Sequence, residues 1–283
     1  MKKIKSIIGL LLLLIAVQNS FARNQNVFAS NVFVENKGQF DGWVNTNAPV
    51  KFAINSSDKI FFTAQGLTIK LTGKEIDEEA LEQMERKQGK KIEKKTGAYF
   101  VNMQWEGCNK NSVLASSEES EGYYTFGEKG FENIKAKGFR KLIYKELYPG
   151  IDAEYVIPEK GGIKYSLIIH PGADITKIKM KYSGDVGKIK ISADGNILMA
   201  TPAGEITDRA PLSFYKNNSE KINSSFEIKG NIVSFRLDSK AQNTNQSIII
   251  DPWTTTPTSL TTNNAALTNN TEIKKKGNVS ILK

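Results

Sequence analysis

Histidine and cysteine are nearly absent from this chain, which has one of each in 283 residues, His170 and Cys108. A structural or catalytic zinc site needs several His or Cys ligands, so we expect no metal site. One cysteine cannot form an internal disulfide, and a domain of this size does not need one. A Ser-His-Asp or Cys-His site would have to use His170, and no Gly-x-Ser-x-Gly segment supplies a nucleophile. We interpret His170 as a residue at a strand end and Cys108 as an idle thiol.

Carboxylates remain as candidates, because a pair of them is enough for glycoside hydrolysis. Asp152, Glu154, Asp174 and Asp185 are available. Asp152 and Asp174 each follow a Pro-Gly turn, where aspartate is favoured because its side chain bonds nearby backbone amides. The chain also lacks an Asp-x-Asp-x-Asp calcium loop, a phosphate-binding loop and a dinucleotide fingerprint. We therefore predict no catalytic, cofactor-binding or metal-binding residues, no cofactor and no enzymatic activity.

Long apolar runs are confined to the N-terminus. Residues 1–5 carry three lysines, an apolar run extends from Ile7 to Val17, and Ser20-Phe21-Ala22 has the small-x-small pattern of a cleavage site. This order predicts a secretory signal peptide cut after Ala22, because the run is too short to cross a bilayer core of about 30 Å. Since no later segment is apolar enough to span, we expect a secreted or cell-surface protein with no membrane span after cleavage.

Alternating apolar and polar residues between tight turns dominate the rest of the chain. The turns are Pro-Gly or Gly-Gly pairs, in which one residue fixes φ or the next supplies a positive φ. They predict a four-stranded antiparallel meander with strands at Arg140–Glu146, Ala153–Ile157, Ile163–His170 and Lys177–Tyr182. In the last strand, lysines alternate with Ile178, Met180 and Tyr182, which predicts a half-buried strand.

Hairpin patterns recur on both sides of this meander. Lys59–Leu71 has two strand-like runs around Ala64-Gln65-Gly66, and Asp194-Gly195 joins two further alternating runs. We interpret 113–122 as a polar loop. More than a dozen short strands predict an all-β fold, an antiparallel β-sandwich or two fused β-sheets built of hairpins and meanders. No repeat of 20 to 50 residues is visible, so the chain itself is not a propeller.

Composition sets the expected domain boundaries. Residues 23–30 form a flexible lead-in, 31–253 the all-β domain, and 254–283 a disordered tail rich in Thr and Asn. Within the domain, 74–95 is a charged insertion whose acids precede its bases, and it fits either a short surface helix or a loop.

The net charge of +9 falls to +6 when residues 1–22 are removed, because they contain three lysines and no acid. A basic balance can favour nucleic acid or an anionic polysaccharide, but we prefer the interpretation that alternate lysines lie on solvated strand faces. We expect no nucleic-acid partner. Trp43, Trp105 and Trp253 would supply a sugar-stacking platform, although Trp105 ends an apolar strand and is expected in the core.

Several segments resemble a known family in the same order. They are Glu35–Gln39, Tyr148–Asp152, Lys164–Ile169, Pro171–Asp174, Asp194-Gly195, Ala210-Pro211 and Ile248–Pro252. Together they are similar to the N-terminal domain of bacterial SBBP-repeat (β-propeller) surface proteins, many of them from Bacteroidetes and associated with gliding motility or type IX secretion. The resemblance covers roughly 31–253 and implies a domain with no established activity and no catalytic residues.

These observations lead to one functional hypothesis and two alternatives. The first is an exported, non-enzymatic β-domain, a structural or adhesive N-terminal module of a bacterial cell-surface or secreted protein. Its partner would be a cell-surface protein or a polysaccharide. The alternatives are a carbohydrate-binding module and, third, a glycoside hydrolase or peptidase.

Overall fold

The structure is a computed structural model that describes residues 31–46, 48–55, 59–73, 86, 97–127, 129–159, 161–238, 245–257, 274–275 and 279–282. The predicted signal peptide and lead-in lie outside the described residues, as does the charged insertion apart from Arg86. Among the described residues, no helix is long and apolar enough to cross a membrane.

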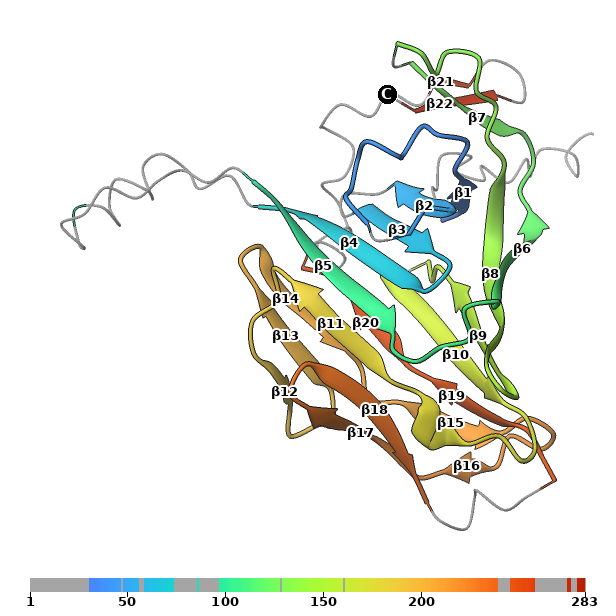
Figure 1. Cartoon of the computed structure of the whole chain (residues 1–283), viewed down its shortest axis with the longest axis vertical. Coiled ribbons are helices and arrows are strands. Elements are labelled where there is room, and N and C mark those ends of the chain that lie inside the picture. The colour runs from blue at the N-terminus through green and yellow to red at the C-terminus, as the bar shows by residue number, and fades with distance from the viewer. Residues whose placement is uncertain are drawn as a thin grey trace, which may run out of the picture.

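The fold is all-β, as the alternating pattern predicts, with one short 3₁₀ helix (Figure 1). In chain order the elements are β1 (Phe33–Glu35), β2 (Phe52–Asn55), β3 (Lys59–Thr63), β4 (Gly66–Thr72), β5 (Ala98–Trp105), β6 (Val113–Glu119), β7 (Tyr123–Phe126), β8 (Gly138–Tyr148), β9 (Ile151–Val156), β10 (Ile163–Ile169), η1 (Ile175–Lys177), β11 (Met180–Gly184), β12 (Ile189–Ile191), β13 (Ile197–Thr201), β14 (Gly204–Asp208), β15 (Leu212–Tyr215), β16 (Lys221–Ile222), β17 (Ser224–Lys229), β18 (Ile232–Leu237), β19 (Ile248–Asp251), β20 (Trp253–Thr255), β21 (Lys274–Lys275) and β22 (Val279–Leu282).

Nineteen strands form one antiparallel sheet that curls almost closed. Following the pairings, the sheet runs β17-β18-β11-β5-β4-β3-β2-β1-β8-β9-β10, with β6 on the other side of β8. Beyond β10 it divides into β19-β15-β16 and β20-β14-β13-β12. Strands β12 and β17 come into contact, so the sheet becomes a barrel-like sandwich with two walls facing each other (Figure 1). A separate small sheet joins β7, β22 and β21.

The central meander is confirmed for three of its four strands. Strands β8, β9 and β10 pair in sequence, with Tyr165 opposite Tyr155. The prediction for the fourth strand is wrong in position. Ile175–Lys177 forms η1, and β11, which follows it, pairs with β5 and β18 instead of with β10. The free edge of β10 is instead taken by β19 and β20, which come from much later in the chain. The alternation itself is correct, because Ile178, Met180 and Tyr182 are buried.

Two other predictions about secondary structure are wrong. Residues 113–122 do not form a polar loop, because Val113–Glu119 forms β6 and pairs with β8. An edge strand has one neighbour and keeps polar side chains, so its composition resembles that of a loop. The domain extends past its expected end at residue 253, because β20 continues to Thr255 and pairs with β10 and β14. Most of the tail predicted at 254–283 lies outside the described residues. Both hairpin predictions, β3–β4 and β12–β13, are confirmed.

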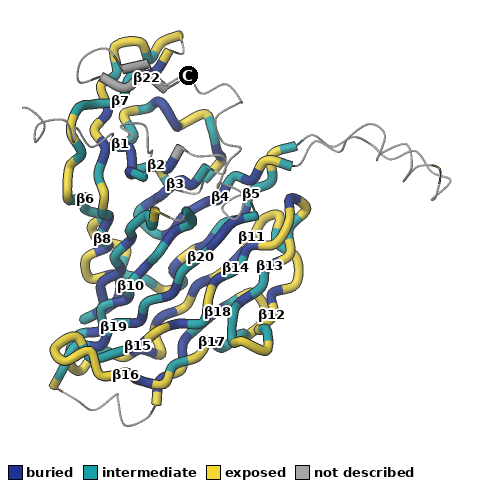
Figure 2. The backbone as a smooth tube through the Cα atoms, turned by 180° about the vertical axis from the view of Figure 1, so that it is seen from behind, coloured by how far each residue is buried: buried dark blue, intermediate teal, exposed yellow. Residues whose placement is uncertain are grey.

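The main hydrophobic core lies between the two walls, where the inward side of nearly every strand is buried (Figure 2). A second, smaller core covers the outer face of β1–β3 and contains Phe40, Phe61 and Phe126. Its presence explains the unbroken apolar run Ile60-Phe61-Phe62, because Phe62 packs in the main core while Phe61 packs in the second. A strand covered on both faces does not alternate.

Candidate functional site

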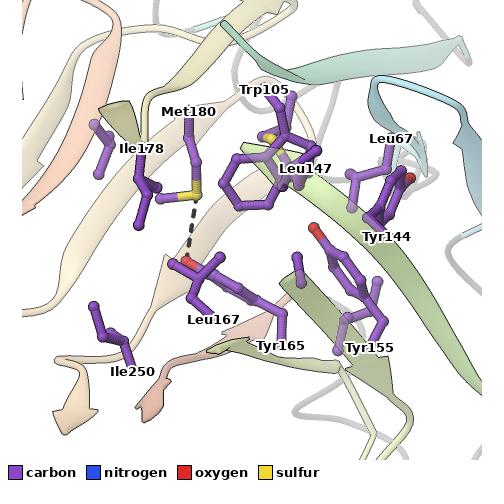
Figure 3. Close-up of a cluster of buried hydrophobic side chains, with 14 of the residues drawn as sticks. Leu67, Trp105, Tyr144, Leu147, Tyr155, Tyr165, Leu167, Ile178, Met180 and Ile250 are labelled. Carbon is purple, nitrogen blue, oxygen red and sulfur yellow. Dashed lines mark hydrogen bonds between the residues drawn. The ribbon is translucent and has the colours of Figure 1, made fainter. Parts of the chain in front are cut away.

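Four buried tyrosines and one buried aspartate form a cluster between the walls, in the main core. Its members are Tyr144 of β8, Tyr155 of β9, Tyr165 of β10, Tyr182 of β11 and Asp208 of β14. The rings of Tyr155 and Tyr165 stack with centroids 5.8 Å apart, and the ring of Tyr144 meets that of Tyr155 edge-on at 5.8 Å (Figure 3). The three rings come from successive strands of the meander. Tyr165 is directly opposite Tyr155, and Tyr144, which is opposite Ala153, is a diagonal neighbour of Tyr155.

Asp208 is the one carboxylate of this cluster, and its exposed fraction is 0%. Its Oδ2 accepts a 2.7 Å hydrogen bond from the Tyr165 hydroxyl, and its Oδ1 accepts a 3.2 Å bond from the Thr254 hydroxyl. Burial raises the pKa of Asp208 to about 7, and the two hydroxyl donors offset part of that rise. The side chain is therefore an acid that takes up or releases its proton close to neutral pH.

The tyrosines cannot act as bases beside it. Burial raises the pKa values of Tyr155, Tyr165 and Tyr182 well above the ordinary value for tyrosine, and that of Tyr144 rises for the same reason. Their hydroxyls stay protonated and act as hydrogen-bond donors. The Tyr144 hydroxyl, for example, donates to the carbonyl oxygens of Thr63 and Gly66 at 2.8 and 3.0 Å. The cluster thus ties opposite walls together.

A cavity of about 30 Å³ lies against this cluster. It is lined by Ile60, Leu67, Ile69, Met103, Tyr155, Ile163, Tyr165, Met180, Tyr182, Met199, Thr254 and Thr256. One water needs roughly 10–15 Å³ of such space, so the cavity has room for about two waters. Pockets for metabolites or sugars are on the order of 300–1,000 Å³. This cavity therefore has no room for a substrate of that size.

His170 and Asp152 lie close together, where β9 begins and β10 ends. His170 Nε2 lies 3.5 Å from Asp152 Oδ2, which also accepts a 3.0 Å bond from Lys145 Nζ. The other oxygen, Oδ1, accepts a 2.8 Å bond from the Glu146 amide. Glu146 has φ +49° in the β-bulge that interrupts the β8–β9 ladder, so Asp152 caps this bulge.

The protonation state of Asp152 fits that role. Burial acts to raise its pKa, but the Glu146 amide, Lys145 and His170 together hold the pKa below the ordinary value for aspartate. The carboxylate is ionised and engaged by three donors. The expectation that Asp152 bonds a nearby backbone amide is confirmed, although the amide belongs to the preceding strand rather than to its own turn.

The other candidate carboxylates lie apart and each bonds a local partner. Asp174 caps η1 by accepting from the amide and hydroxyl of Thr176. Glu154 pairs with Lys141 at 3.1 Å, and Asp185 accepts a 2.8 Å bond from the Phe100 amide. Within the described part of the chain, no group of three or more His, Cys, Asp or Glu residues is placed to hold a metal ion.

The three tryptophans occupy three different environments and do not form a shared platform. Trp105 is 1% exposed and packs in the main core, as its strand pattern predicts. Trp43 packs edge-on against Phe40 in the second core. Trp253 lies half-buried on β20, and its Nε1 donates to the Gly161 carbonyl at 3.1 Å. Cys108 is half-buried, and burial raises the pKa of its thiol, which makes it a poor nucleophile.

Sequence reasoning missed Asp208, although a signal for it exists. Ile206 and Asp208 are two residues apart on β14, so they share the inward face of that strand. An aspartate on the apolar side of a strand is unusual enough to single out. Its partners Tyr165 and Thr254 could not be found in this way, because they come from strands 43 and 46 residues away in the chain.

The fold and this cluster define an all-β domain with a closed, hydrogen-bonded interior. The chain belongs to the family described as Domain of unknown function (DUF7948), whose match covers residues 33–253. The match begins at β1 and ends at the first residue of β20, so it spans the large sheet except for the last two residues of β20. Neither the comparison with curated proteins nor that with solved structures found a match.

Proposed function

We propose that this protein is an exported, non-enzymatic β-domain that serves as a structural or adhesive module of a bacterial cell-surface or secreted protein. The observation that carries this proposal is how the reactive-looking side chains are used. Asp152 caps a bulge, Asp174 caps η1, and Asp208 bonds Tyr165 and Thr254 of the neighbouring strands β10 and β20. Each therefore stabilises the fold.

Export is supported by the order of charged, apolar and small residues over 1–22. The likeness of several turn segments to N-terminal domains of SBBP-repeat surface proteins of Bacteroidetes supports a place at the cell surface. In a bacterial host, the mature protein should start at Arg23 and be found outside the cytoplasm. Leu13→Arg should block export because it interrupts the apolar run, and Leu13→Val should not. A wild-type protein kept in the cell with Met1 intact would contradict export.

Carbohydrate binding is the second candidate, because Trp43 and Trp253 are each only half-buried. However, Lys59 Nζ lies 5.5 Å from the centre of the Trp43 ring, and the Arg209 guanidinium lies 5.0 Å from that of Trp253. A sugar would have to displace these cations to stack on the same faces. We expect no ligand on a glycan array. A bound glycan whose binding is lost in Trp43→Ala would support this second candidate instead.

A further inference from the structure

Strand β6 forms one margin of the large sheet (Figure 1). In the described part of the molecule it pairs with β8 and with no second strand. In an antiparallel pair every second residue directs its N–H and C=O away from the partner strand. The outer side of β6 therefore offers a row of backbone donors and acceptors to another strand.

Natural proteins protect such edges with lysine, proline or very short strands. The other strands of the large sheet that have one partner follow this rule: β12, β16 and β17 contain Lys190, Lys221 and Lys229. With seven residues, β6 is longer than any of these three. Its first five residues, Val-Leu-Ala-Ser-Ser, carry no charge and no proline, and Val113 is 62% exposed. This segment therefore lacks the protection that the other edges have.

We propose that β6 pairs antiparallel with β6 of a second copy of this chain, around a two-fold axis at Ala115. A two-fold axis perpendicular to the sheet leaves the outer faces of the two copies on the same side of the joined sheet. Each outward-facing residue of β6 must therefore lie opposite an outward-facing residue of the second β6. Val113, Ala115 and Ser117 are two residues apart in sequence, so they share one face of β6. An axis at Ala115 sets Val113 opposite Ser117 of the second copy. The whole uncharged segment of one copy then pairs with the same segment of the other.

Charge favours a second copy in this orientation. The acids Glu118, Glu119 and Glu121 follow the uncharged segment, and Lys110 precedes it, all of them exposed. Antiparallel pairing at Ala115 brings the turn that contains Lys110 close to the acidic end of β6 of the second copy. A parallel arrangement would place the acids of both copies together, which is unfavourable. The two ends of this segment therefore carry opposite charges that meet across the axis, in addition to the ion pairs that Glu118 and Glu119 form with Lys141 and Lys137 of their own chain.

Disulfide trapping tests the register. In an antiparallel pair, residues directly opposite have Cα atoms about 4.5–5.5 Å apart, within the range of a disulfide. With Cys108 replaced by serine, Ala115→Cys should form a covalent dimer under mild oxidation. Ser117→Cys should not, because its symmetry mate lies about 13 Å away at roughly 3.4 Å per residue. Ser225→Cys, exposed on the edge strand β17, controls for random collision.

Sedimentation of the purified protein over a concentration series provides the second readout. We expect a monomer–dimer equilibrium for the wild type and a monomer for Ala115→Lys, which sets two like charges on the axis. Thermal unfolding checks that Ala115→Lys is folded, and Ser225→Lys should dimerise as the wild type does. The proposal is overturned if the wild type stays monomeric at its highest soluble concentration, if Ala115→Lys still dimerises, or if Ala115→Cys crosslinks no faster than Ser117→Cys.

Discussion

The Tyr165 hydroxyl donates a 2.7 Å hydrogen bond to Asp208 Oδ2, and both side chains are buried between the walls of the sheet. Tyr165 comes from the wall that contains the meander, and Asp208 lies on β14, which β20 connects to the same wall. The pair couples the protonation of one buried acid to the stability of the whole domain.

The first prediction is that stability falls as pH rises toward neutrality. The pKa of Asp208 is raised in the folded state to about 7, whereas the ordinary value is 3.8. Between these values the folded protein binds more protons than the unfolded chain. The stabilisation is complete below about pH 4 and is lost as pH rises through 7. The loss should reach about 4 kcal/mol between pH 4 and pH 8.

Denaturant unfolding at several pH values measures this effect. Asp208→Asn cannot titrate, so its stability should depend less on pH than that of the wild type over the same range. Glu205→Gln is the matched control, because Glu205 is exposed on the same strand. Parallel curves for the wild type and Asp208→Asn would show that Asp208 does not titrate in this window.

The second prediction concerns two buried tyrosines. Tyr144→Phe removes the donor to the carbonyl oxygens of Thr63 and Gly66 and should lower the free energy of unfolding by about 1–3 kcal/mol. Tyr182→Phe should cost less, because the Tyr182 hydroxyl makes a 4.0 Å contact with Met180 Sδ. Denaturant midpoints compare the two variants, and an equal loss would show that the Tyr144 bonds add nothing.

The third prediction uses two glycines with nearly the same backbone conformation. Gly162 has φ +78° and Gly172 has φ +81°. A Cβ at Gly162 would lie 2.4 Å from the Thr254 carbonyl oxygen, whereas a Cβ at Gly172 would meet no atom within 4 Å. Gly172→Ala should cost about 1–2 kcal/mol for its left-handed backbone, and Gly162→Ala clearly more. If the Gly162→Ala and Gly172→Ala variants had similar melting temperatures, β20 would have to move away from the new Cβ at residue 162 without any loss of stability.

The fourth prediction concerns the contribution of Asp152 to stability. Asp152→Ala leaves the Glu146 amide without its charged acceptor and should cost about 2 kcal/mol. His170→Ala should cost less, because the His170 side chain is 42% exposed. Since the pKa of Asp152 is lowered, its stabilisation is present above the ordinary value of 3.8 and is lost as pH falls through the folded value. Acid unfolding of the wild type and Asp152→Asn measures that loss.

The amino-acid sequence by itself determined the all-β class, the β3–β4 and β12–β13 hairpins, the first three strands of the meander and the burial of Trp105 and Met180. These follow from local rules: alternation assigns faces, and Gly or Pro fixes turns, so a few neighbouring residues contain the information. The same rules indicated that Asp174 serves as a cap.

Only the tertiary structure decided which distant strands meet. Periodicity does not show that β11 leaves β10 to join β5, or that the serine-rich segment from Val113 is an edge strand. For the same reason, the bond between Asp208 and Tyr165 could not be read from the sequence. Pairing between distant strands depends on how the whole sheet curls, and no single segment contains that information.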